Sequence, residues 1–121
     1  MTTMEIGRTL VGLCQQGKNH EAIDTLYADD VVSVEAGAPA GMSADTAGKA
    51  AVLAKGQWWI DNHEVHSAET TGPWPHGDQF IVGHRYDVTF KQSGQRFVME
   101  EKALYTVADG KIVREVFFYA T

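Results

Sequence analysis

An imidazole and a phenol stand within an otherwise apolar face in the stretch QFIVGHRYDVTF, residues 79–90. The stretch alternates as a β-strand does, so every second side chain points to the same side. A histidine on such a face is usually a satisfied core residue, and a buried tyrosine usually places its hydroxyl on a backbone carbonyl. The alternative is a cavity wall, on which His84 and Tyr86 could donate or accept protons. The side chains that share their face are Phe80, Val82, Val88 and Phe90.

Two glutamates occupy comparable positions. Glu101 interrupts the apolar face of a second alternating stretch, residues 95–107, and Glu35 ends the β-branched run VVSVE. A carboxylate that faces an apolar layer either has a charged partner or has a raised pKa. The partner of Glu101 could be Arg85 or Arg114, and Glu35 could instead be a rim residue bound to solvent or to a backbone amide. Without a register shift, all these polar groups could meet in one cavity, with Glu35 as a candidate general base.

Several other side chains are expected to contact a ligand in such a cavity. Trp58 and Trp59 are adjacent in a helical stretch, so one should pack in the core while the other walls the pocket or a dimer contact. HEVH, residues 63–66, lacks the spacing of a helical zinc motif, and we expect no metal there. His66 is expected near His84 on a neighbouring strand. The remaining expected ligand contacts are Met99, Phe117 and Tyr119.

The spacing of apolar residues indicates which helices and strands could position these groups: a helical repeat in the first half of the chain and strict alternation in the second. Thr2 and Glu5 fit a capping box, Asn19 can cap a second helix, and GPWPHGD, residues 72–78, is typical of a turn. The small-residue segment 36–44 is expected to be a lid or rim loop. We predict helices over 3–16, 19–27 and 45–62, and strands over 31–35, 64–71, 79–91, 95–107 and 111–119.

The order of these elements predicts an α+β fold. Consecutive strands joined by short turns form an antiparallel sheet, and only the three helices can cover one of its faces. A curved sheet wrapped around them encloses a cone, whose wide end is a natural pocket. Both sides of the last strand are apolar, so we expect a homodimer through the outer sheet face. The two sets are Ile112, Val116 and Phe118 on one side, and Val113, Phe117 and Tyr119 on the other.

Composition limits the function classes. A chain of 121 residues with 44% hydrophobic and 21% charged residues is a single globular domain, residues 1–121. The net charge of −6 and the scattered basic residues argue against nucleic acid and anionic membranes as partners. The one cysteine, Cys14, is expected to be a buried structural thiol. Neither a signal peptide nor a membrane span is visible, so a cytoplasmic location is expected.

Two segments carry a resemblance to a known family. AIDTLYADDVVSVE, residues 22–35, and EEKALYTVADGKIVREVFFY, residues 100–119, resemble the nuclear transport factor 2-like superfamily, and its SnoaL-like (polyketide-cyclase-like) branch most of all. The resemblance covers essentially the whole chain and implies a cone-shaped α+β domain, commonly a homodimer, with a pocket between sheet and helices. By similarity to ketosteroid isomerase, Glu35 falls on the general base and Glu101 close to the hydrogen-bonding acid. The oxyanion-hole tyrosine of that enzyme falls on Val11, which cannot donate a hydrogen bond.

Two functions therefore remain open. The first is binding of a small, mostly apolar ligand with cofactor-free acid–base catalysis of the isomerase, cyclase or dehydratase type. Glu35 would take a proton next to a carbonyl group, and Glu101, with His84 or Tyr86, would stabilise the oxyanion. No dinucleotide or phosphate-loop motif is present, and this chemistry needs no cofactor. The second is a non-catalytic ligand-binding or dimeric scaffold protein, because the fold hosts both kinds of function.

Overall fold

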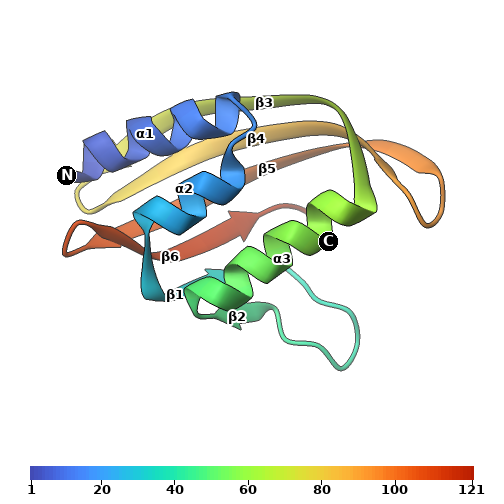
Figure 1. The fold of residues 1–121 in the computed structure, drawn as a ribbon, viewed down its shortest axis with the longest axis horizontal. Coiled ribbons are helices and arrows are strands. Elements are labelled where there is room, and N and C mark those ends of the chain that lie inside the picture. The colour runs from blue at the N-terminus through green and yellow to red at the C-terminus, as the bar shows by residue number, and fades with distance from the viewer.

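The computed structural model describes residues 1–121 and consists of three helices and one six-stranded sheet. The sheet is curved and open, with the strand order β2-β1-β6-β5-β4-β3, and the helices lie on one side of it (Figure 1). The predicted α+β architecture is therefore confirmed. In chain order the elements are α1 (Thr3–Gln15), α2 (Asn19–Leu26), β1 (Tyr27–Val34), β2 (Asp45–Ala47), α3 (Lys49–Asn62), β3 (His63–His76), β4 (Gln79–Phe90), β5 (Gln95–Ala108) and β6 (Lys111–Phe118).

The sheet is mixed, whereas the sequence predicted an antiparallel one. Strands β3 to β6 pair antiparallel through short turns, but β1 runs parallel to β6. A tight hairpin forces its two strands to be antiparallel, and no hairpin joins β1 to β6. Their direction is set by the long connection through β2 and α3, which alternation along single strands does not reveal.

The predicted helix cap is confirmed for α1 and wrong for α2, and α3 starts later than predicted. Thr2 and Glu5 form the capping box of α1, and Gly17, with a φ of +73°, follows its end. Helix α2 is preceded by Lys18, which makes no side-chain capping bond, and Asn19 is already the first helical residue. Helix α3 begins only at Lys49.

Residues 45–47 form the short strand β2 instead of the predicted start of α3. They pair antiparallel with β1, and backbone hydrogen bonds from Glu35 to Ala44 and from Gly48 to Val31 hold the two strands together. Asp45, Thr46 and Gly48 are weak helix formers, so strand pairing determines the conformation of this segment. Residues 36–44 are consequently the loop of this β1–β2 hairpin.

Register shifts account for two further corrections. Strand β3 continues into the predicted turn at residues 72–78 and ends only at His76, and the register shift between Thr71 and Trp74 contains Pro73. In β6, Ile112 pairs with Val107 and Arg114 with Thr106, which leaves one extra residue between them. Ile112 is therefore fully buried in the core and does not share the outer side with Val116 and Phe118, as the sequence had predicted.

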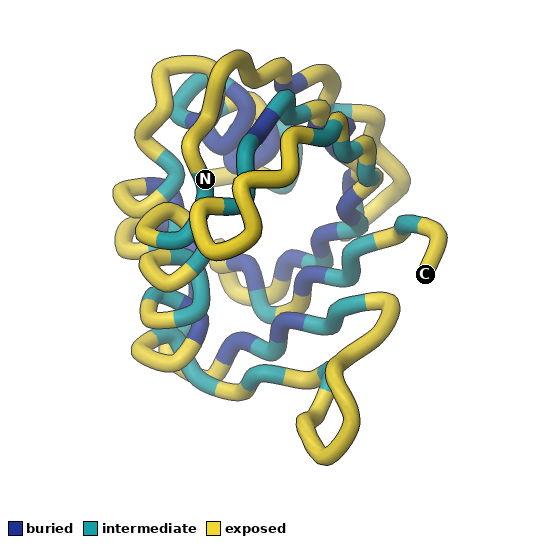
Figure 2. The backbone as a smooth tube through the Cα atoms, turned by 90° about the vertical axis from the view of Figure 1, so that its right-hand side faces the viewer, coloured by how far each residue is buried: buried dark blue, intermediate teal, exposed yellow.

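The core lies between the inner face of the sheet and helices α1 and α2. Ile6 and Leu10 of α1 pack with Phe80 and Val82 of β4, and all four are almost inaccessible to solvent. Figure 2 shows buried residues alternating with exposed or partly buried ones along the strands. Cys14 is part of this core, and burial raises the pKa of its thiol to about 12, as suits a structural residue. None of the helices has the length and apolar character needed to cross a bilayer.

Candidate functional site

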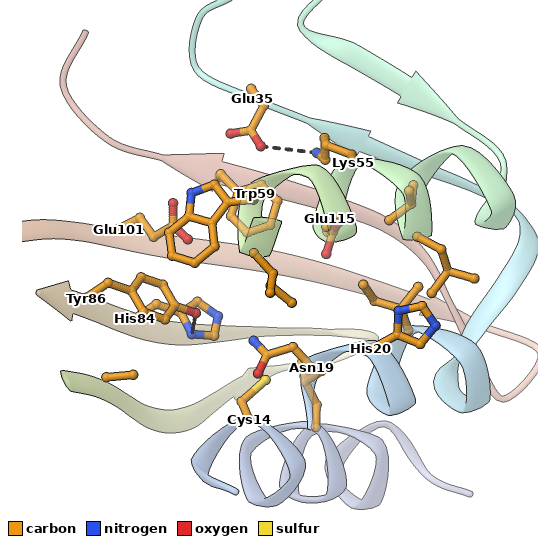
Figure 3. A pocket seen from close by; sticks show the side chains of 18 of the residues that line it. Cys14, Asn19, His20, Glu35, Lys55, Trp59, His84, Tyr86, Glu101 and Glu115 are labelled. Carbon is orange, nitrogen blue, oxygen red and sulfur yellow. Dashed lines mark hydrogen bonds and ion pairs between the residues drawn. The ribbon is translucent and has the colours of Figure 1, made fainter. Parts of the chain in front are cut away.

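A cavity of about 650 Å³ lies between the sheet and the helices, beside the packed core. Its walls come from the α1–α2 turn, α3 and strands β3 to β6, and 15 of its 24 lining residues are hydrophobic. Pockets for small molecules typically have this size and this apolar character. The labelled side chains in Figure 3 point into the cavity from these different elements.

Glu35, immediately after β1, lies at the cavity wall in an ion pair. Its Oε1 is 3.1 Å from Lys55 Nζ, and the hydroxyl of Tyr119 donates to its Oε2 at 2.9 Å (Figure 3). Lys55 also donates to Ser33 Oγ at 2.6 Å and lies 5.4 Å from the centroid of the Phe117 ring. The partner of Glu35 is thus a lysine and not a backbone amide, and 30% of the glutamate side chain remains exposed. These contacts hold the carboxyl group in a fixed position at the cavity wall.

Glu101 faces the cavity from β5 and makes no hydrogen bond or ion pair. Burial raises its pKa to about 7, and the charges of Glu35 and Glu115 add to that rise, while Lys55 opposes it. Arg85, one of the partners considered from the sequence, instead pairs with Glu100 on the outer face, 3.4 Å away. Glu101 therefore changes its charge close to neutral pH.

His84 and Tyr86 form the next part of the wall. His84 is 5% exposed, with Nδ1 3.3 Å from Thr70 Oγ1 and 3.4 Å from the Tyr86 hydroxyl, and Nε2 3.5 Å from the Tyr105 hydroxyl. Burial, with a smaller contribution from Lys102, lowers the pKa of His84 to about 4. Burial also raises the pKa of Tyr86. Both groups are therefore neutral at physiological pH and can serve as hydrogen-bond donors.

Glu115 of β6 is a third cavity carboxyl, which the sequence analysis did not identify. It is 3% exposed, and the hydroxyl of Tyr27 donates a short hydrogen bond to it. Burial raises its pKa, and the hydrogen bonds from Tyr27 and Ser33 only partly offset that effect. Glu115 follows the alternation of Phe117 and Tyr119, so the same face pattern could have indicated it. Lys55 carried no comparable signal, since a lysine in a helix is normally solvated.

The expected ligand contacts divide into two groups. Trp59 lies in the cavity wall, where it stacks on His63 with ring centroids 4.4 Å apart and lies 5.3 Å from Tyr86. Trp58 is 54% exposed and His66 is exposed, and neither lines the cavity. His66 falls at the register shift between Val65 and Ser67, and its Nε2 lies 2.7 Å from Thr89 Oγ1. The other lining residues that the sequence analysis named are Met99, Phe117 and Tyr119.

The cavity offers proton-transfer groups more readily than metal ligands. No group of three or more His, Cys, Asp or Glu side chains is arranged to hold a metal ion. The three carboxyls instead differ in environment: Glu35 is paired with a lysine, Glu101 has no partner, and Glu115 is buried against a phenol. Groups of one chemical type held in unlike environments are characteristic of acid–base sites.

The open α+β cone with an internal cavity is the architecture of the nuclear transport factor 2-like superfamily. Residues 1–119 match the SnoaL-like domain family, and the chain belongs to that family. A Mesorhizobium loti protein, named as a candidate SnoaL-like polyketide cyclase with carbohydrate phosphatase as a second description, is 44% identical to this chain. The match covers 98% of this chain and 100% of that one, with a TM-score of 0.91.

More distant structures share the fold alone. A candidate isomerase from Bacillus subtilis is 19% identical over 99% of this chain and 90% of that one, with a TM-score of 0.76. A Xanthomonas campestris protein of unknown function with a cystatin-like fold is 20% identical over 100% of this chain and 92% of that one, with a TM-score of 0.78. No protein among the curated ones matches this sequence.

Proposed function

We propose that the cavity binds a small, mostly apolar ligand and transfers a proton to and from it without a cofactor. The observation that carries this proposal is a carboxylate, Glu35, held by Lys55 at the wall of a 650 Å³ apolar cavity. A carboxylate held in place next to a bound carbonyl compound is suited to removing a proton from the adjacent carbon. The reaction class is that of isomerases, cyclases and dehydratases.

The neutral groups opposite Glu35 suit the second half of such a reaction. Removal of a carbon-bound proton leaves an enolate oxygen, which needs hydrogen-bond donors that are already in place. The Tyr86 hydroxyl lines the cavity and is neutral at physiological pH, and His84 supports it from 3.4 Å away. Glu35, once protonated, returns the proton to another carbon or to a leaving oxygen.

Deuterium exchange into β-tetralone tests this proposal with an apolar ketone that has acidic carbon-bound protons. We expect the protein in deuterated buffer to accelerate the loss of those proton signals in the NMR spectrum. Glu35→Gln should slow the exchange by about a hundredfold. Glu100→Gln is the matched control, because it removes the same charge from an exposed carboxylate paired with Arg85 outside the cavity. Equal rates for Glu35→Gln and wild type would disprove the assignment of the base.

A non-catalytic binding protein is the second candidate function. Val11 stands where ketosteroid isomerase has its helix-one tyrosine, and it is buried in the core without any donor group. Saturable binding of β-tetralone without accelerated exchange would favour this candidate.

We also propose that a second copy of the chain covers the outer face of the sheet. An unbroken apolar row crosses five strands there, because each of its members is the registered partner of the next. Exposed charges of both signs, Arg85, Glu100 and Lys102, flank the row and could pair across a two-fold axis. The row consists of Val34, Val116, Leu104, Ile81 and Trp74.

Sedimentation equilibrium tests this assembly. We expect a dimer at micromolar concentration, and a monomer for Ile81→Arg, which places a charge within the row. A wild-type monomer at that concentration would contradict the proposal.

A further inference from the structure

The charges around the cavity do not balance. Glu35, Glu101 and Glu115 all line it, whereas Lys55 is the only lysine or arginine that does. Lys55 is already committed to Glu35 and Ser33, at 3.1 and 2.6 Å. His84 is neutral at physiological pH. When Glu101 ionises, the cavity therefore offers no free lysine or arginine to pair with it.

Aromatic rings surround the carboxyl that lacks a partner. The ring centroids of Trp59 and Tyr86 lie 5.3 Å apart in the cavity wall. The negative charge of Glu101 is close enough to contribute to the raised pKa of Tyr86. Figure 3 shows Glu101, Trp59 and Tyr86 directed into the same space. The faces of tryptophan and tyrosine rings attract organic cations, and a carboxylate in a low-dielectric cavity attracts them more strongly.

We infer that the ligand of this cavity is an apolar amine that binds as its ammonium ion, with Glu101 as its counter-ion and Trp59 and Tyr86 as its aromatic walls. This inference rests on the proposed function, in that it takes the cavity to be a ligand site. It adds the ligand's charge, which the proton-transfer chemistry leaves open. The apolar body of the amine would occupy the hydrophobic part of the cavity, against Leu53 and Met99.

Other ligand charges fit this site less well. An anion, such as a carboxylate or a phosphate ester, would lie near three carboxyl groups and find no free lysine or arginine. A neutral molecule of the same shape would gain the apolar contacts and at most a hydrogen bond to Glu101, without the charge pairing that an ammonium ion supplies. Among ligands with the same apolar body, the cation therefore gains the most binding free energy from this cavity.

Three adamantane derivatives test the inference, because they share one rigid apolar body and differ in charge. Adamantylamine is a cation, adamantanol is neutral and adamantanecarboxylate is an anion at pH 8. Their dissociation constants can be measured through tryptophan fluorescence, to which Trp59 in the cavity wall contributes together with Trp58 and Trp74, and calorimetry gives an independent readout. We expect the amine to bind at least about tenfold more tightly than the alcohol, and the carboxylate to bind most weakly.

Two variants separate the role of Glu101 from that of net charge. Glu101→Gln should abolish the advantage of the amine and leave adamantanol binding within about twofold of wild type. Glu100→Gln removes the neighbouring charge, which points out of the cavity, and should preserve that advantage. Equal binding of amine and alcohol by wild type, or an unchanged advantage in Glu101→Gln, would overturn the inference while the ligand cavity stands. Failure of all three compounds to bind would overturn the cavity proposal as well.

Discussion

Replacing Glu101 by glutamine should make the protein more stable at neutral and alkaline pH. The pKa of Glu101 is about 7 in the folded protein, against a usual value of 4.5. The folded state therefore holds the proton more tightly than the unfolded state does. The contribution of Glu101 to stability is constant below pH 4.5, falls as the pH rises towards 7, and reaches the full penalty above 7. At about 1.4 kcal/mol for each pH unit between the two pKa values, the penalty is about 3 kcal/mol.

Glutamine keeps the shape of the side chain and cannot ionise, so Glu101→Gln removes this penalty. We expect a gain of about 2–3 kcal/mol at pH 8, because the buried amide keeps a small cost of its own, and no gain at pH 4. In thermal unfolding this corresponds to a melting temperature higher by roughly 6–12 °C at pH 8. The assay is urea unfolding followed by circular dichroism from pH 4 to pH 8.

The matched control for this experiment is Glu100→Gln. Glu100 is exposed and paired with Arg85, so its replacement should change stability by less than about 1 kcal/mol at any pH. A Glu101→Gln curve parallel to that of wild type across the whole pH range would refute the reasoning. In that case the carboxyl would be solvated or paired with a cation, and the charge argument for the ligand would fail with it.

Three further substitutions probe the packing around the site. Protonation of His84 should cost up to about 3 kcal/mol as the pH falls from 6.5 to 4, because its folded-state pKa is lowered to about 4. This contribution is opposite in sign to that of Glu101, so His84→Gln should gain stability relative to wild type as the pH falls towards 4 in urea unfolding. Tyr27→Phe should cost about 1–3 kcal/mol in the same assay, because it removes the hydroxyl that donates to buried Glu115, and an unchanged stability would contradict that role. Gly7→Ala should cost about 1–3 kcal/mol, because its new methyl group would meet the ring of Pro73 at 3.0 Å. Gly12→Ala, which meets nothing within 4 Å in the same helix, should not destabilise the protein.

Alternation along single strands was enough to predict much of the cavity wall. It placed His84 and Tyr86 on the inner side of β4 and Glu101 on the inner side of β5. Both placements are right because the two strands pair in continuous register over twelve residue pairs. Where register is continuous, the side of each residue follows from its position alone.

The predictions failed where a strand gains a residue or where pairing joins distant segments. The extra residue in β6 moved Ile112 inward, and the shift beside Val65 placed His66 outside the cavity. Lys55 could not be predicted as the partner of Glu35, because their contact depends on how α3 packs over β1. Such tertiary contacts leave no periodic signature in the sequence.

The central claim is that an apolar molecule can enter the space between the sheet and the helices, and methyl NMR tests it most directly. Met99 lines the cavity, whereas its neighbour Val98 is half exposed on the outer face. On addition of adamantanol, we expect the methyl signals of Met99 and Leu53 to shift and those of Val98 and Ile81 to stay in place. Shifts confined to Val98 and Ile81, or no shifts at all at saturating adamantanol, would contradict the claim.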